Sequence, residues 1–517
     1  MTKQFSNYSD LLTFTRASKG HALRPVSYGP ELVTNGTFDT TIGWTGVAST
    51  TDARWYINNG TLTKGGTNGV AEQIANPFVA GKTYLVQFDV TAIPLGVVLV
   101  GIGNATHQFT STGTQSVVLS PTDVSSSLRF FTGGAGGGGV VIDNVSVKEV
   151  LFDQPDGTLT LFEHPNNVPR VEYDADGNRL GLLVEEQRTN LVTYSEDFSQ
   201  WDGLNQMLPF GSGSTVNATT APNGTLTADL LVPNTTNSNS HFVRDIASVT
   251  VGNDYTFSVY VKAAGYTTCS LRLYGTDAPI TNFDLSAETT DQSAATITNV
   301  GGGWYRCTLT GEATSTGSWY YVYPNQQATF TGDGTSGIYV WGAQVEAGSF
   351  PTSYIKSNSG STTTRSADVA SIPVADFGYN QSAGTLFVEI GNHAGATTGS
   401  QYVLSLDNDS SAERMQINRF NGNYILDVVD GGASQVSVSV GAGADNSKVA
   451  FAYAANDFAA TEDGDTPVTD TSGSVPTPTQ ISIGTAWNLG APLNGHIKSI
   501  KYFPRRLTNA QLVELTS

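Results

Sequence analysis

The sequence predicts an all-β protein of several antiparallel β-sandwich domains, and three observations support this fold class. Short segments alternate apolar and polar residues, such as TYLVQFDV at 83–90 and YTFSVYV at 255–261, which indicates strands with one buried face. The 56 glycines separate many such segments, and tight turns need residues that tolerate positive φ. The 517 residues of the chain are enough for about three domains.

A repeated order of motifs predicts two sandwiches of one design, at residues 30–150 and 188–356. Each begins with Leu-Val-Thr followed by Phe and Trp, has a strand opened by a Gly three residues before a Tyr, and ends on a long apolar strand. We expect the first and last strands of each unit to pair as neighbours. The matching segments are 32–34 with 191–193, 81–84 with 252–255, and 140–147 with 338–345.

Composition and turn signals assign the rest of the chain. Residues 1–29 are predicted to form a separate N-terminal segment, because they are short and distinct from the repeat units, and residues 151–187 a β-rich connector. The stretch NSGSTTT gives residues 357–372 the composition of a linker. Residues 373–517 are predicted to form a third β domain, which closes with a short helix capped by a Thr or an Asn at 508–509.

The charge of the chain excludes several kinds of partner. A formal net charge of −20 argues against nucleic-acid binding, which needs a basic surface, and against docking on anionic lipid. Residues 1–18 contain no basic and apolar leader, and the longest apolar run, 97–102, is too short to cross a membrane. We therefore expect synthesis in a cytoplasm, no export by the usual route and no membrane insertion.

No motif in the sequence points to a catalytic centre. The six histidines are scattered and match no nucleophile or zinc motif. The adjacent acids Glu185 and Glu186 are interpreted as structural, so the protein is predicted not to be an enzyme. Cys269 and Cys307, the only cysteines, are predicted to be buried thiols, with a cross-strand disulfide as the alternative.

Two parts of the chain resemble known sandwich folds. The segments ELVTNGTF at 31–38, GW at 43–44 and IDNVSV at 142–147 resemble a carbohydrate-binding-module jelly roll of the galactose-binding-like type. The segment LNGHIKSIKYF at 493–503 with RRLT at 505–508 is similar to the end of a concanavalin A-like or laminin-G-like sandwich. The resemblances imply tandem antiparallel jelly-roll β-sandwiches followed by a C-terminal concanavalin A-like sandwich.

A third, longer set of motifs resembles a recurrent core of tailed-bacteriophage virion proteins. It comprises TFTRAS at 13–18, PRVEY at 169–173, GLLVEEQRTNL at 181–191, YVWGAQVEAGSFPTSYI at 339–355 and TRSAD at 364–368. The resemblance implies a tail-fibre, spike or head-decoration protein on the virion surface, made in the bacterial host cytoplasm. It also implies attachment to other capsid or tail proteins through residues 1–29, and a homotrimer.

Such a protein is expected to be an accessory or structural component that binds glycans of the host surface. Two alternatives stay open. One is a tailspike-type glycan depolymerase, since glycosidase carboxylates come from distant strands and leave no local motif. The other is a decoration protein that has no ligand.

Two groups of residues are candidates for binding a ligand or a cation. Exposed rings stack on sugars, and the predicted platforms are the strand residues Trp319, Tyr321 and Tyr323, which share one face, and the pair Trp55 and Tyr56; the alternative for each is a place in the core. The carbohydrate-binding-module resemblance implies a structural calcium at Asp143, with oxygens from the strand that carries Asn35 and Asp39. The alternative for these polar residues is simple solvation.

Overall fold

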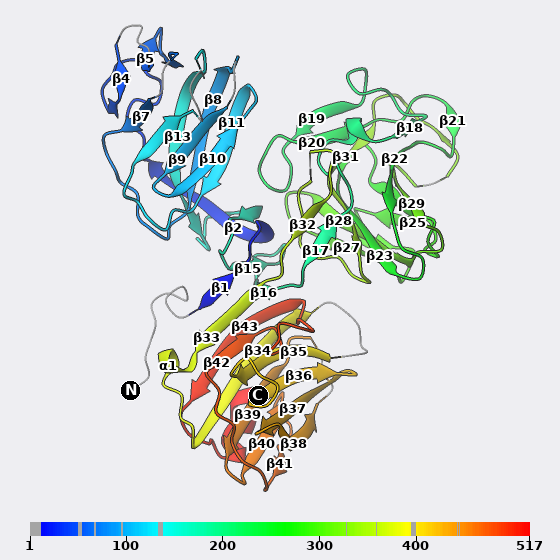
Figure 1. Cartoon of the computed structure of the whole chain (residues 1–517). Coiled ribbons are helices and arrows are strands. Elements are labelled where there is room, and N and C mark those ends of the chain that lie inside the picture. The colour runs from blue at the N-terminus through cyan, green and yellow to red at the C-terminus, as the bar shows by residue number, and fades with distance from the viewer. Residues whose placement is uncertain are drawn as a thin grey trace. The chain divides into compact units, whose positions relative to one another are not determined.

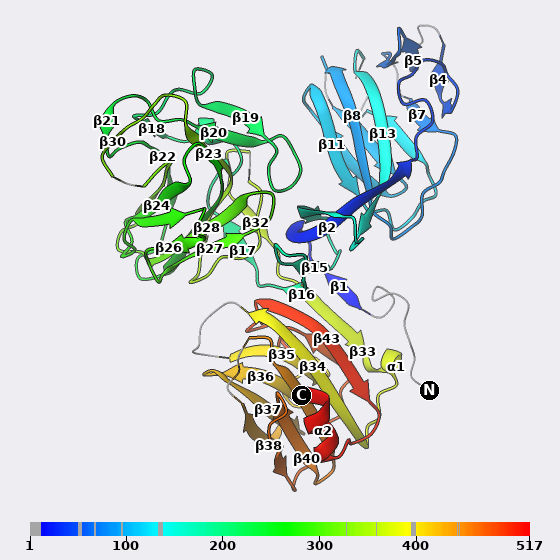
Figure 2. The ribbon, with the colours of Figure 1, turned by 180° about the vertical axis from the view of Figure 1, so that it is seen from behind.

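The computed structural model describes residues 12–49, 54–66, 69–94, 97–132, 138–326, 328–357, 359–393, 400–441, 443 and 445–517. It confirms the predicted fold class, because the described chain consists of layered, mostly antiparallel sheets with only two short α-helices (Figures 1 and 2). The chain divides into two compact units. One contains residues 25–158, and the other contains residues 1–24 and 159–517.

The unit of residues 25–158 is a single β-sandwich. Its core is filled by alternate side chains, as predicted for 83–90, where Tyr84, Val86 and Phe88 are buried. One sheet has the order β11 (Gly113–Leu119), β8 (Tyr84–Ala92), β13 (Val141–Phe152), β6 (Thr61–Lys64), β5 (Trp55–Asn58), β4 (Val47–Ala48). The other has the order β10 (Ala105–Phe109), β9 (Val98–Ile102), β12 (Leu128–Phe131), β7 (Val70–Gln73), β3 (Trp44–Thr45).

A second sandwich, within the larger unit, again has two sheets around one core. The first has the order β19 (Thr215–Thr219), β20 (Ala228–Leu231), β31 (Gly337–Ala347), β23 (Asp254–Ala264), β28 (Trp304–Glu312), β27 (Ala295–Asn299). The second has the order β18 (Gly203–Asn205), β22 (Phe242–Ser248), β29 (Gly317–Tyr323), β24 (Thr268–Tyr274), β25 (Thr281–Asp284), β26 (Thr289–Thr290). Cys269 and Cys307 belong to this core and are buried free thiols.

The two sandwiches share one strand order, which agrees with the repeat in the sequence. The sheet order β11-β8-β13-β6 in the first corresponds to β28-β23-β31-β20 in the second. Likewise, β10-β9-β12-β7-β3 corresponds to β25-β24-β29-β22-β18, and every matched strand occurs in the same order along the chain. Strand β12 of the first sandwich therefore occupies the place that β29 occupies in the second.

The C-terminal sandwich is built around a separate core. One sheet has the order β1 (Thr13–Thr15), β33 (Val369–Pro373), β42 (Gln480–Ile483), β35 (Ser400–Asp407), β36 (Arg414–Phe420), β37 (Asn423–Asp430), β38 (Ala433–Val440). The other has the order β15 (Arg170–Tyr173), β16 (Arg179–Val184), β43 (Gly495–Phe503), β34 (Ala383–His393), β39 (Lys448–Ala454), β40 (Phe458–Glu462), β41 (Val468–Asp470). Helix α1 (Val374–Phe377) follows β33. The predicted final helix is α2 (Asn509–Thr516), which Thr508 caps through a capping box with Gln511.

The structure corrects three of the predicted boundaries. Within residues 1–29, β1 is an edge strand of the C-terminal sandwich, since Phe14 is buried in that core. The connector at 151–187 supplies β15 and β16 to the same sandwich, where β16 pairs with β43. The linker at 357–372 contains β32 (Thr363–Arg365), paired with β17 (Arg188–Asn190), and most of β33. These segments are held by strand pairing, which their polar composition did not indicate.

The described residues include no helix that is long and apolar enough to cross a membrane.

Candidate functional site

The outer face of the sheet around β29 gathers aromatic and arginine side chains. Along β29, Tyr320 and Val322 point into the core, so Trp319, Tyr321 and Tyr323 share the opposite face, as predicted. The cross-strand register aligns the same face of the neighbouring strands with these three residues. We call this surface the aromatic face; it comprises Phe242, Arg244 and Ile246 of β22, Trp319, Tyr321 and Tyr323 of β29, and Ser270, Arg272 and Tyr274 of β24.

Two guanidinium groups lie over the rings of this face. The Arg244 guanidinium is 4.2 Å from the centre of the Trp319 ring and 5.7 Å from that of Tyr321, whose hydroxyl accepts a hydrogen bond from Nη1 at 3.1 Å. The Arg272 guanidinium is 4.6 Å from the Tyr274 ring centre and 5.6 Å from that of Tyr321. Tyr321 and Tyr323 are stacked at 6.0 Å. The rings and cations therefore hold one another in fixed orientations.

The exposure of the rings corrects part of the prediction. Tyr321 and Tyr323 are only 7% and 4% exposed, because the guanidinium groups and Phe242 cover them. Trp319 is half-buried, and Tyr274 is 52% exposed. Four further residues of this face, Phe242, Arg244, Arg272 and Tyr274, were not predicted. The alternation in FVRDI at 242–246 and SLRLY at 270–274 could have placed them on one face.

The second predicted sugar platform is wrong for one of its two residues. The Trp55 side chain is fully buried in the core of the first sandwich, and its Nε1 donates to the carbonyl of Gly69 at 3.0 Å. Tyr56 lies on the opposite side of β5 and is partly exposed. A single half-exposed ring offers a sugar much less surface than the aromatic face does.

The residues proposed for calcium lie close together in the first sandwich. Gly36 accepts a backbone hydrogen bond from Val145, which brings the turn of Asn35 and Asp39 beside the strand of Asp143. The Asn35 amide closes this turn, since its Nδ2 donates to Thr40 and its Oδ1 accepts from the Asp39 amide. Across the described parts of the chain, no three His, Cys, Asp or Glu residues come together as a metal group. Calcium here would depend largely on backbone oxygens and stays a prediction.

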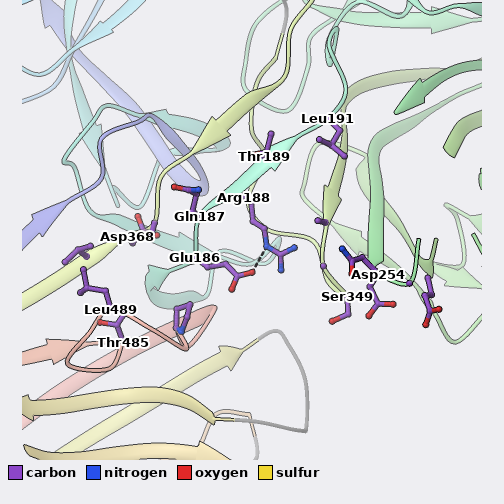
Figure 3. Close-up of a pocket in the computed structure, with 18 residues that line it drawn as sticks. Glu186, Gln187, Arg188, Thr189, Leu191, Asp254, Ser349, Asp368, Thr485 and Leu489 are labelled. Atoms are coloured by element: carbon purple, nitrogen blue, oxygen red, sulfur yellow. Dashed lines mark hydrogen bonds and ion pairs between the residues drawn. The ribbon is translucent and has the colours of Figure 1, made fainter. Parts of the chain in front are cut away.

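A cleft of about 950 Å³ lies in the larger unit (Figure 3). Its floor is the segment from Glu186 to Leu191, where Glu186 pairs with Arg188, and the Arg188 guanidinium lies 4.8 Å from the Phe350 ring centre. Asp254 and Glu312 belong to its wall. Because its basic group is already paired with Glu186, the cleft offers a ligand mainly carboxylates, and it carries less recognition chemistry than the aromatic face.

A buried ionic cluster explains the long shared motif of the sequence. It contains Arg16, Arg170, Glu185, Arg365 and Asp368, which are between 0% and 6% exposed. Arg16 pairs with Asp368 at 3.1 Å and Arg170 with Glu185 at 2.9 Å, while Arg170 also contacts Asp368 and Arg365 contacts Glu185. The cluster thus ties together the N-terminal, connector and linker segments of the predicted scheme.

Glu185 is unsuited to proton transfer in this setting. Burial alone would raise its pKa, but the charges of Arg365 and Arg170 and the hydrogen bonds from Ser353 hold the pKa well below its ordinary value. The carboxylate therefore stays ionised near neutral pH. The adjacent acid pair in the motif accordingly has a structural role at Glu185, and Glu186 serves in the pairing with Arg188.

Comparison with known proteins leaves the chain without an assigned family. No protein-family model and no curated protein matches it. Among solved structures, it is similar to a sialidase CBM40 of Ruminococcus gnavus bound to α2,3-sialyllactose, with 14% identity over 27% of this chain and 84% of that chain and a TM-score of 0.23. It is also similar to domains LG4-5 of the mouse laminin α1 chain, with 12% identity over 60% of this chain and 94% of that chain and a TM-score of 0.21. A Trypanosoma rangeli sialidase complex matches with 12% identity over 90% of this chain and 83% of that chain at a TM-score of 0.23. At these scores, function has to be inferred from the residues of the chain itself.

Proposed function

We propose that this protein is a non-enzymatic glycan-binding protein and that the aromatic face of the second sandwich is its binding surface. The observation that carries the proposal is the assembly of Trp319, Phe242 and Tyr274 with two arginines on the solvent side of one sheet. Aromatic rings stack on the apolar C–H face of a sugar, and nearby donors bind its hydroxyl groups. Both kinds of group are present here within three adjacent strands.

The aromatic face is organised before any ligand arrives. Antiparallel hydrogen-bonded pairing of β22 with β29 and of β29 with β24 fixes the position of each strand. The guanidinium groups of Arg244 and Arg272 pack on the rings and restrict their orientation. A rigid platform loses little conformational entropy when a ligand binds, so even shallow contacts contribute to affinity. This arrangement suits a weak, repeated interaction with an extended polysaccharide.

We further infer that the protein serves as an accessory or structural protein on the surface of a phage virion. The support is the long virion-protein motif, whose separated parts meet in the buried ionic cluster and thus form one structural scaffold. On this proposal, the chain attaches to other capsid or tail proteins, and a homotrimer multiplies the glycan sites by avidity. A structural calcium at Asp143 belongs to the same proposal.

Binding to an array of bacterial surface polysaccharides tests the glycan-binding function. We expect the full chain to bind a subset of them and Trp319→Ala to reduce binding at least about tenfold, since one stacked ring contributes about 1.4 kcal/mol or more. Phe131→Ala is the matched control, because β12 holds the place of β29 in the first sandwich. Equal loss in both variants would place the glycan site outside the aromatic face, and no binding at all would leave the decoration protein as the explanation. Release of sugar products would establish the depolymerase.

A further inference from the structure

We propose that the aromatic face selects acidic glycans, which carry a carboxylate or a sulfate on a sugar ring. The inference rests on the proposed glycan-binding function and names its ligand class. Its basis is the state of Arg244 and Arg272, which meet rings and hydroxyl groups on this face but have no acidic partner among the described residues.

Several buried arginines of this chain have an acidic partner, whereas others, such as Arg129 and Arg419, are held by neutral groups. The sequence has 45 acidic and only 25 basic residues, so carboxylates are abundant. Arg16, Arg170 and Arg365 are each paired with Asp368 or Glu185, and Arg188 is paired with Glu186. Two neighbouring cations left on an open face therefore form a local site for an anion in an acidic protein.

The acids near the aromatic face are directed elsewhere. Asp245 accepts a hydrogen bond from Tyr320, whose ring belongs to the core. Asp284 accepts from Ser286, and Asp291 accepts from Asn282 at the edge of the sheet. These carboxylates are engaged in local hydrogen bonds, so an incoming anion does not have to displace them from the arginines.

The geometry of Arg244 leaves one of its terminal nitrogens, Nη2, without a hydrogen-bond partner among the described residues. Its guanidinium plane lies on the Trp319 ring, and its Nη1 donates to the Tyr321 hydroxyl. Its Nε is buried and has no hydrogen-bond partner among the described residues. A guanidinium that stacks through its face can still present N–H groups along its edge, and that fork fits an oxyanion. Arg272 approaches the same Tyr321 ring from the opposite neighbouring strand.

Gly203 provides the space in which Arg244 lies. A Cβ atom at residue 203 would stand 2.6 Å from Cγ and 2.7 Å from Nε of Arg244. Replacing this glycine by alanine would therefore push the Arg244 side chain away from its position without removing its charge. The variant separates the placement of the guanidinium from its mere presence.

The test compares each acidic glycan with its neutral derivative. The probes are uronate-containing and sulfated oligosaccharides, each paired with its carboxyl-reduced or desulfated product, and titration calorimetry measures binding to the full chain. We expect the acidic member of a pair to bind at least about tenfold more tightly, a difference of about 1.4 kcal/mol. Arg244→Gln and Arg272→Gln should each reduce this preference to about threefold or less, and Gly203→Ala should reduce it similarly.

Two controls make the result decisive. Arg129→Gln removes an arginine from β12 at the equivalent face of the first sandwich, where Arg129 is held by Gly103 and Ser126, and it should leave the preference unchanged. Arg272→Lys keeps the charge but not the planar fork, and it should retain only part of the preference. Equal binding of acidic and neutral partners would overturn the acidic-glycan proposal while glycan binding stands. Absence of binding to every probe would overturn the proposed function itself, and unchanged preference in both arginine variants would place the anion elsewhere.

Discussion

The second sandwich has two aromatic outer faces, and only one of them is open. On the sheet around β23 and β31, Tyr260, Trp304 and Trp341 point away from the core of the sandwich, yet all three are at most 3% exposed. Leu23 and Leu161 pack on them, together with Tyr354. On the sheet around β29, the outer rings of Tyr321 and Tyr323 are covered by their own neighbours on that face, Arg244, Arg272 and Phe242.

The difference between these faces lies in segments far away in the sequence. Leu23 belongs to β2 (Gly20–Glu31) and Leu161 to β14 (Thr158–His164), and Leu161 also donates a backbone hydrogen bond to Pro222 at 2.9 Å. The covered face is therefore an internal packing surface, on which residues of β2 and β14 pack within the larger unit. The aromatic face has the same kind of strand pattern but retains accessible ring area, and this is why we assign ligand binding to it.

The largest expected effect is on the covered face. Trp341 is fully buried, packs on Tyr260 and Tyr354, and donates from Nε1 to Thr227 at 3.0 Å. Trp341→Ala should lower the free energy of unfolding of the larger unit by about 3–5 kcal/mol, measured by urea denaturation. A loss below about 1 kcal/mol would mean that Leu23 and Leu161 do not cover this face in solution.

The covering segments also make the covered side sensitive to acid. Burial lowers the pKa of His21 and of His164, so the unfolded chain binds more protons than the folded chain once the pH falls below the ordinary value of 6.5. Stability from these groups is complete above that pH and is lost as the pH falls from that value toward the folded-state pKa of each histidine. Asp229 opposes this trend, because burial raises its pKa to about 7.

A variant isolates the contribution of one histidine from the opposing carboxyl group. In His164→Gln, the slope of unfolding free energy against pH between about 6 and 5 should be smaller than in the unmodified chain by about 1.4 kcal/mol per pH unit. Urea midpoints at several pH values give the slope directly. Parallel pH profiles for the two proteins would show that His164 is accessible to protons in the folded state, and hence that β14 does not seal this side.

The contrast between the faces also marks where sequence reasoning succeeds and fails. Period-2 alternation placed Trp319, Tyr321 and Tyr323 on one face, and it predicted the all-β class, because side-chain direction along a strand is a local property. Whether a side chain is covered by other residues, in contrast, depends on segments that are distant in the sequence. Trp55 was predicted to be exposed and is buried, and the rings of Tyr321 and Tyr323 are covered by arginines from adjacent strands.

The linker and connector show the same limit for charged residues. A polar, Ser- and Thr-rich stretch such as 357–372 indicates an exposed segment when its composition is considered alone. Arg365 and Asp368 in that stretch are nevertheless 1% exposed, since their partners lie up to 352 residues away in the chain. Only the shared motif, which contains all five residues of the ionic cluster, signalled that these distant charges belong together.

The smallest expected effect on stability is at Trp319, and it completes the comparison with Trp341. Trp319 is half-buried, and its ring contacts the Arg244 guanidinium at 4.2 Å, a contact that contributes about 0.5–1 kcal/mol at an exposed site. Trp319→Ala should therefore lower the free energy of unfolding by only about 1 kcal/mol, measured by the same urea denaturation as Trp341→Ala, while it removes one ring of the aromatic face. A loss of about 3 kcal/mol or more would mean that Trp319 is a packing residue like Trp341. The two faces would then be equivalent, and the reason for placing a glycan on one of them would disappear.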